Sequence, residues 1–130
     1  FSLEMQFSKD SLTLNYINAG QHPILMYQNG TLTPLDDSQK LLGVIEAEYK
    51  TSSITLKKSP VRLLLYSDGA FDVFNKAGKH LGYKKFFEWV TASLSLGAAE
   101  QLTYLRQKIE TYTGSGYASD DLALIIIEIR

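Results

Sequence analysis

Two pairs of residues with metal-binding potential stand at the ends of apolar segments. Asp68 and Gly69 follow the apolar run 61–67. The pair Asp120 and Asp121 comes directly before the apolar run 122–129. If the two runs are neighbouring antiparallel strands, the end of one and the start of the other lie at the same edge of a sheet, so the carboxylates converge. Such a site suits Mg²⁺ or Mn²⁺ rather than zinc, and Gly69 would allow a sharp turn beneath the ion.

A purely structural interpretation of the same residues is also open. Asp-Gly after a strand is most often a turn, and Asp-Asp before a strand is usually part of a solvated loop. Spacing alone therefore does not decide between a metal site and two ordinary loops.

The elements that would position these carboxylates begin with β structure. The stretch Asn29-Gly30 is a strong hairpin signal, and the segments on either side of Ser8–Ser11 have strand-forming composition. We expect a loop over 18–23, where Asn18, Gly20 and Pro23 are turn residues. The expected strands cover residues 2–7, 12–17, the two arms of a hairpin over 24–35, 49–56, 61–67 and 122–129.

After Gly82 the apolar period changes from two residues to between three and four. This pattern predicts two consecutive helices, Tyr83–Leu94 and Ala98–Thr113, before the chain returns to strand. The expected fold class is α+β, with antiparallel strands and a helix pair packed on one sheet face.

Composition excludes several other classes of protein. The chain has 130 residues, which is enough for one domain, and its formal net charge of −1 offers no basic stripe for nucleic acid or for a membrane surface. It has no cysteine, which excludes disulfides and thiolate chemistry and suits a cytoplasmic location. No apolar run approaches the roughly 20 residues of a transmembrane helix. Because the sequence opens on Phe1, we expect it to be part of a longer polypeptide.

Three motifs in order resemble one known family. They are YINAGQHPILMYQNGTLTPL, LLLYSDGAFDVFNKAGKHLG and GYASDDLALIIIEI, and together they span nearly the whole chain. This order resembles the C-terminal half of bacterial PPM (protein phosphatase 2C-like) serine phosphatases of the SpoIIE and RsbU type. The resemblance implies that residues 1–130 form the C-terminal part of a single domain with a partial PPM-type β-sandwich, whose upstream part is absent.

The resemblance also implies a metal site. Asp68 matches the metal-binding aspartate of the family's Asp-Gly motif, and Asp120 matches the first aspartate of the closing pair. Asp121 is the second position of that pair and would reach the metal through water. In such enzymes two Mn²⁺ or Mg²⁺ ions activate a water that attacks the phosphorus of a phosphoserine.

On this basis we expect part of a metal-dependent serine/threonine phosphoprotein phosphatase. Its expected substrate is a phosphorylated anti-sigma factor antagonist, and an upstream sensor or receiver domain would control it. The alternative is a catalytically degenerate module of the same fold that binds a regulatory protein without turnover.

Four departures from the family pattern keep that alternative open. The upstream Gly-Asp-x-x-Gly-His-Gly stretch, which carries a further metal aspartate, does not occur in this sequence. Ala123 stands where threonine or serine is usual, Asp72 where glutamate is common, and Gln21 is an extra residue before His22. We therefore expect the 130-residue chain alone to bind divalent metal weakly, to show negligible activity, and to self-associate through an uncovered apolar face or strand edge.

Several other residues receive a structural interpretation. His22 belongs to a loop, and His80 is interpreted as a solvated turn residue without a histidine or carboxylate at ligand spacing. Trp89, Phe86 and Phe87 are at helical spacing and are expected to be core.

Overall fold

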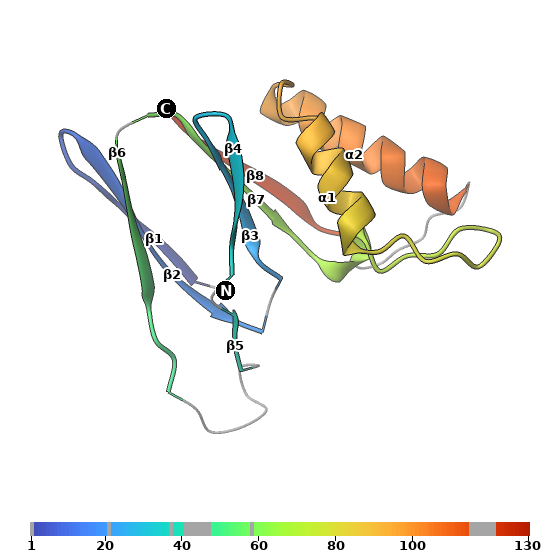
Figure 1. Ribbon diagram of the computed structural model, residues 1–130, viewed down its shortest axis with the longest axis horizontal. Coiled ribbons are helices and arrows are strands. Elements are labelled where there is room, and N and C mark those ends of the chain that lie inside the picture. The colour runs from blue at the N-terminus through green and yellow to red at the C-terminus, as the bar shows by residue number, and fades with distance from the viewer. Residues whose placement is uncertain (1, 21, 37, 41–47, 58, 115–121) are drawn as a thin grey trace. The chain divides into compact units, whose positions relative to one another are not determined.

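The computed structural model describes residues 2–20, 22–36, 38–40, 48–57, 59–114 and 122–130 (Figure 1). The chain divides into two compact units. The first comprises Phe1–Arg62 together with Ile129–Arg130, and the second comprises Leu63–Glu128. The chain therefore passes from the first unit to the second after Arg62, and residues 129–130 belong to the first unit again.

A sheet with β2 at its centre dominates the first unit. The strand β2 (Ser11–Ala19) pairs antiparallel with β1 (Ser2–Phe7) on one side and with β6 (Ser52–Lys57) on the other. Alternate side chains of β2 are buried, as the period of two residues in a strand requires. The buried residues are Leu12, Leu14, Tyr16 and Asn18. Of these, only Asn18 is not strongly apolar, so this face of β2 is almost entirely hydrophobic.

The second hairpin of the first unit has the turn that its sequence predicts. The strands β3 (Ile24–Gln28) and β4 (Thr31–Leu35) pair antiparallel, with Gln28 opposite Thr31. Asn29 and Gly30, the two turn residues, have φ of 50° and 81°. Two successive positive φ values define a type I′ turn, whose twist matches that of the strands. The hairpin prediction is confirmed.

Two details of the first unit differ from the sequence prediction. The strand β2 continues to Ala19, because Asn18 and Ala19 pair in parallel with a short strand, β5 (Ser38–Gln39). The sequence contains no local signal for β5. The loop predicted at 18–23 therefore begins at Gly20, two residues later than predicted. The strand β6 begins at Ser52 rather than at residue 49.

The strands β7 (Val61–Tyr66) and β8 (Leu124–Ile129) are neighbours and lie mostly in the second unit. In β7, both odd and even positions include buried side chains, among them Leu63 and Leu64. This burial explains the continuous apolar run in the sequence. In β8, by contrast, Ile125 is 54% exposed.

Two helices complete the second unit: α1 (Tyr83–Ala92) and α2 (Ala98–Thr113). The ring of Phe86 on α1 is fully buried, and its centroid lies 5.0 Å from the ring centroid of Tyr66 on β7. Between the helices, Gln101 donates a hydrogen bond of 3.1 Å from Nε2 to the hydroxyl oxygen of Ser93. The helix pair is thus attached to the sheet by an aromatic contact and held together by a buried polar one.

The first helix ends two residues earlier than predicted. The Ser93 hydroxyl donates to the carbonyl oxygens of Trp89 and Val90, at 3.0 and 2.9 Å. Such side-chain bonds compete with the backbone pattern of a helix. The second helix has the predicted bounds, and Glu100 accepts a hydrogen bond of 3.2 Å from the backbone N–H of Gly97 at its start.

The fold class is α+β, as predicted, with two sheets of mainly antiparallel strands and a helix pair. Neither α1 nor α2 combines the length and the apolar character that crossing a membrane requires.

Candidate metal site

The ends of β7 and β8 meet through two hydrogen bonds. The backbone N–H of Ser67 donates to the carbonyl oxygen of Ala123 at 3.0 Å, and the N–H of Ala123 donates to the hydroxyl oxygen of Ser67 at 2.9 Å. Because Ser67 follows the end of β7 and Ala123 precedes the start of β8, the two strands run antiparallel here. The end of β7 and the start of β8 are therefore neighbours, as expected.

Asp68 lies in the next position, at the start of a short 3₁₀ turn (Asp68–Ala70). Its backbone carbonyl oxygen accepts hydrogen bonds from the N–H groups of Phe71 and Asp72, at 2.9 and 2.7 Å. Its carboxylate is exposed, and Oδ1 accepts a hydrogen bond of 3.0 Å from the N–H of Gly69. The turn thus holds the backbone of Asp68 firmly and leaves its side chain at the surface.

Gly69 is the central residue of this turn and is buried. It is not among the described glycines with positive φ, which are Gly20, Gly30, Gly78, Gly82 and Gly114. The turn itself therefore does not require the conformational freedom of glycine, on which the predicted sharp turn at Gly69 depends.

The predicted partners Asp120 and Asp121 lie outside the described residues. Ser67 is hydrogen-bonded to Ala123, which lies two residues after Asp121 in the sequence. The described residues alone hold no cluster of three or more histidine, cysteine, aspartate or glutamate side chains that would suit a metal. The convergence of Asp68 with Asp120 and Asp121 stays a prediction.

One polar pair near this site was missed. The Nε2 atom of His80 is 2.9 Å from Oδ1 of Asp72. No histidine or carboxylate stands at ligand spacing from His80 in the sequence, but the fold brings Asp72 to it. The expected exposure of His80 is confirmed, at 46%. The two residues are eight apart, and an isolated antiparallel bridge between Phe74 and His80 reverses the chain between them.

A signal for this reversal was present in the sequence. Asn75 Oδ1 accepts hydrogen bonds from the N–H groups of Ala77 and Lys79, at 3.0 and 2.9 Å, and Gly78 has a φ of 73°. An asparagine followed three residues later by glycine is a turn pattern of this kind. Of the three aromatic residues expected to be core, Phe86 is buried, whereas Phe87 and Trp89 are only half-buried. His22, which was interpreted as a loop residue, is exposed.

A protein-family model matches almost the whole chain. The model described as Stage II sporulation protein E (SpoIIE) matches residues 3–130. The chain belongs to the SpoIIE family. No curated protein sequence matches it. Membership agrees with the resemblance that the three sequence motifs indicate.

Solved structures show which fold this SpoIIE-family chain has. It is similar to the SiaA-PP2C domain of Pseudomonas aeruginosa, with a TM-score of 0.71, 16% identity, and coverage of 92% of this chain and 47% of that one. It is also similar to the PP2C phosphatase domain of SpoIIE from Bacillus subtilis, solved with a fragment of its regulatory domain, with a TM-score of 0.61, 18% identity, and coverage of 92% and 37%.

A third similar structure is the serine/threonine phosphatase PstP/Ppp of Mycobacterium tuberculosis, with a TM-score of 0.58, 15% identity, and coverage of 97% and 57%. At these identities the likeness establishes the PP2C fold. The SpoIIE-family chain spans between about a third and somewhat over half of the length of these three structures.

Proposed function

We propose that the chain is the C-terminal part of a metal-dependent serine/threonine phosphoprotein phosphatase. Membership of the SpoIIE family and the PP2C fold support this function. The observation that carries it is the pair of hydrogen bonds between Ser67 and Ala123. Those bonds bring Asp68 to the edge of the sheet at which the segment after Asp121 enters β8.

The exposed carboxylate of Asp68 suits a hard divalent cation. Within the described residues, Asp68 makes no ion pair, and of its two carboxylate oxygens only Oδ1 accepts a hydrogen bond, from Gly69. One carboxylate oxygen is therefore open to a ligand, and oxygen is the donor that Mn²⁺ and Mg²⁺ prefer. Asp68 and Asp120 would hold the ion directly, and Asp121 would do so through water.

A bound Mn²⁺ or Mg²⁺ would activate water and neutralise charge on the phosphoryl oxygens. The part of the protein is to fix the position of the carboxylates. The bonds from the N–H groups of Phe71 and Asp72 to the carbonyl oxygen of Asp68 keep this residue in one place. Such positioning matters because phosphoryl transfer depends chiefly on geometry and on fixed charge.

The proposed substrate is the phosphoserine of an anti-sigma factor antagonist, and the proposed control element is an upstream sensor or receiver domain. Both proposals follow from the resemblance of the three sequence motifs to SpoIIE- and RsbU-type phosphatases. The similar B. subtilis structure contains a fragment of a regulatory domain.

The test is to replace Asp68 with asparagine in the full-length protein. This change keeps an oxygen that can accept the bond from Gly69, so the turn is retained, while the negative charge is lost. Mn²⁺-dependent phosphate release from a phosphoserine peptide should fall at least about a thousandfold. Isothermal titration should show weaker Mn²⁺ binding, and circular dichroism should show an unchanged fold.

A matched control is Asp36→Asn, which removes an exposed carboxylate of the first unit. This variant should keep the wild-type rate and metal affinity. If Asp68→Asn binds Mn²⁺ and releases phosphate as well as Asp36→Asn does, the proposed metal role of Asp68 is wrong.

A non-catalytic binding module is the second candidate. Ala123, at the position where the family usually has threonine or serine, is the feature that favours it. Wild-type full-length protein that binds its protein partner, but neither binds Mn²⁺ nor releases phosphate, would decide for this candidate.

A further inference from the structure

A concave pocket of about 370 Å³ lies in the second unit, and its lining does not include Asp68. Its walls come from the segment before α1, from the first turns of α1, and from Tyr112 near the end of α2. Three lysines line it, namely Lys79, Lys84 and Lys85, against one carboxylate, that of Glu88. The pocket therefore carries a positive charge although the whole chain is slightly negative.

The three lysines differ in how they interact with Glu88. Lys85 Nζ is 2.9 Å from Glu88 Oε2, and the hydrogen bond and charge of Lys85 lower the pKa of Glu88. The charge of Lys84 also lowers the pKa of Glu88, but neither Lys79 nor Lys84 makes an ion pair within the described part of the chain. With Glu88 already neutralised by Lys85, two ammonium groups remain to attract an anion.

The position of Lys84 and Lys85 costs the helix some stability. Both lie in the first turn of α1, where the aligned peptide dipoles are positive, and that turn holds no acidic residue. Acidic residues are the favourable choice at this end of a helix. Positive charge gathered here is consistent with a surface that receives a negative ligand.

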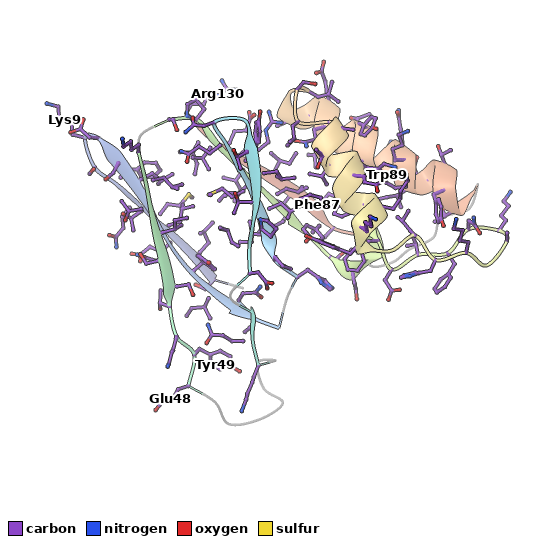
Figure 2. The ribbon with its side chains drawn as sticks, viewed as in Figure 1. Lys9, Glu48, Tyr49, Phe87, Trp89 and Arg130 are labelled. Carbon is purple, nitrogen blue, oxygen red and sulfur yellow. The ribbon has the colours of Figure 1, made fainter. Side chains whose placement is uncertain are left out.

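The wall that carries Lys79 is held in place by hydrogen bonds. The Tyr112 hydroxyl donates to the carbonyl oxygen of Lys79 at 3.0 Å, and the side chain of Asn75 accepts from the N–H of Lys79. Tyr112 is itself packed against Trp89, which Figure 2 labels on α1, with 6.2 Å between the ring centroids. A pre-formed wall of this kind lowers the entropy that binding must overcome.

Hydrogen bonds also connect the pocket to the candidate metal ligand. The N–H of Asp72 donates to the carbonyl oxygen of Asp68 at 2.7 Å, and the carboxylate of Asp72 contacts His80, which lines the pocket, at 2.9 Å. Two hydrogen bonds thus lead from Asp68 to the pocket wall. A peptide bound here would lie near the site at which a phosphoserine is expected to react.

We propose that this pocket binds acidic side chains that flank the phosphoserine of the protein substrate, an inference that rests on the proposed phosphatase function. The pocket has no arginine, the residue suited to bidentate contacts with phosphate. Lysine ammonium groups act as point charges and suit single carboxylates. The volume is at the lower end of the range for ligand sites, which fits one or two side chains rather than a large ligand.

The first experiment measures binding without catalysis. A fluorescein-labelled, unphosphorylated peptide of alternating glutamate and serine is titrated with the full-length protein, and binding is followed by fluorescence anisotropy. The variant Lys79→Glu/Lys84→Glu should bind at least about tenfold more weakly than wild type. Added NaCl should weaken wild-type binding, because the contacts are exposed to solvent.

The matched control is Lys9→Glu/Lys108→Glu, which has the same net charge but leaves the pocket intact. It should bind the peptide like wild type. Equal losses in both variants, no wild-type binding, or tighter binding of a single-stranded oligonucleotide than of the peptide would overturn the proposal. The milder variant Lys79→Gln/Lys84→Gln gives the same answer should the charge reversals prevent folding.

The second experiment uses two phosphoserine peptides, one flanked by glutamates and one by serines. In the Lys79/Lys84 variant, the ratio of kcat/KM for the acidic peptide to that for the neutral peptide should fall about tenfold. In the control variant the ratio should not change. If wild type releases phosphate from neither peptide, the proposed enzyme activity fails, while the anisotropy experiment still decides whether the pocket binds acidic peptide.

Discussion

The two units differ in how far their large apolar side chains are buried. In the second unit, the rings of Tyr66, Phe71 and Phe86 lie within 6.3 Å of one another and all three residues are buried. In the first unit, Met5 and Phe7 on β1 stand opposite the buried Leu14 and Leu12 of β2. Directly opposed residues share a face of the sheet. Nevertheless Met5 is 36% exposed and Phe7 is 66% exposed.

The difference shows that the pattern of a strand does not determine how much of its face is covered. Both β1 and β2 are paired in full register, and both present apolar residues to the same face. Only β2, between two neighbours, is buried at every alternate position. The uncovered apolar face around Met5 and Phe7 is the strongest described candidate for contact with another polypeptide.

The largest expected effect comes from breaking the covered region. Phe86→Ala should reduce the free energy of unfolding by about 3–5 kcal/mol, because the ring is fully buried and its removal leaves a cavity. Urea unfolding followed by circular dichroism measures this change. The comparison variant Phe7→Ala should change it by no more than about 0.5–1 kcal/mol, and similar losses in both variants would remove the contrast between the units.

A second effect concerns the uncovered region. We propose that copies of the chain associate through the face that carries Met5 and Phe7. Phe7→Ser should then raise the dissociation constant for self-association by about tenfold or more, since it removes an aromatic ring from the contact. Sedimentation velocity measures this constant. Phe74→Ser is the matched control, because Phe74 is 58% exposed but lies in the second unit; an equal response of both variants would contradict the proposal.

The smallest expected effect tests whether surface charge contributes to the stability of the second unit. Lys85 lowers the pKa of Glu88, so this pair stabilises the fold above the pKa of Glu88 in the unfolded chain, and the contribution is lost as pH falls through the folded pKa. Lys85→Ala should raise the pKa of Glu88 toward its ordinary value, as measured by NMR titration of the side-chain carboxyl carbon.

Both side chains of that pair are about half exposed, so solvent screens their interaction. The stability of the Lys85→Ala variant at neutral pH should therefore remain close to that of wild type. A loss comparable to that of Phe86→Ala would show that charge, and not the packed rings, distinguishes the second unit.

The sequence predicted most of the elements, because their signals are local. The Asn29-Gly30 turn, the apolar run of β7 and the period of α2 each depend on residues close together in the chain. The short strand β5 could not be predicted, since its two residues are strand only through pairing with Asn18 and Ala19. Likewise, the exposure of Phe7 depends on what lies over the sheet, which the alternation of β1 does not reveal.

Prediction of the candidate site was limited in the same way. The position of Asp68 at the end of β7 follows from the apolar run and the Asp-Gly pair. The contact between Asp72 and His80 was missed because it depends on a chain reversal around Asn75. The lysine-lined pocket could not be predicted from the sequence, since the contribution of Tyr112 from α2 is visible only in three dimensions.

The division of the chain between the units has a consequence for biosynthesis. Residues 129–130 belong with residues 1–62, so the complete first unit forms only after the segment 63–128 has been synthesised. Contacts between residues so far apart in sequence form slowly, because a long loop must close first. The second unit lies within one continuous segment, 63–128, and can assemble as soon as that segment has emerged.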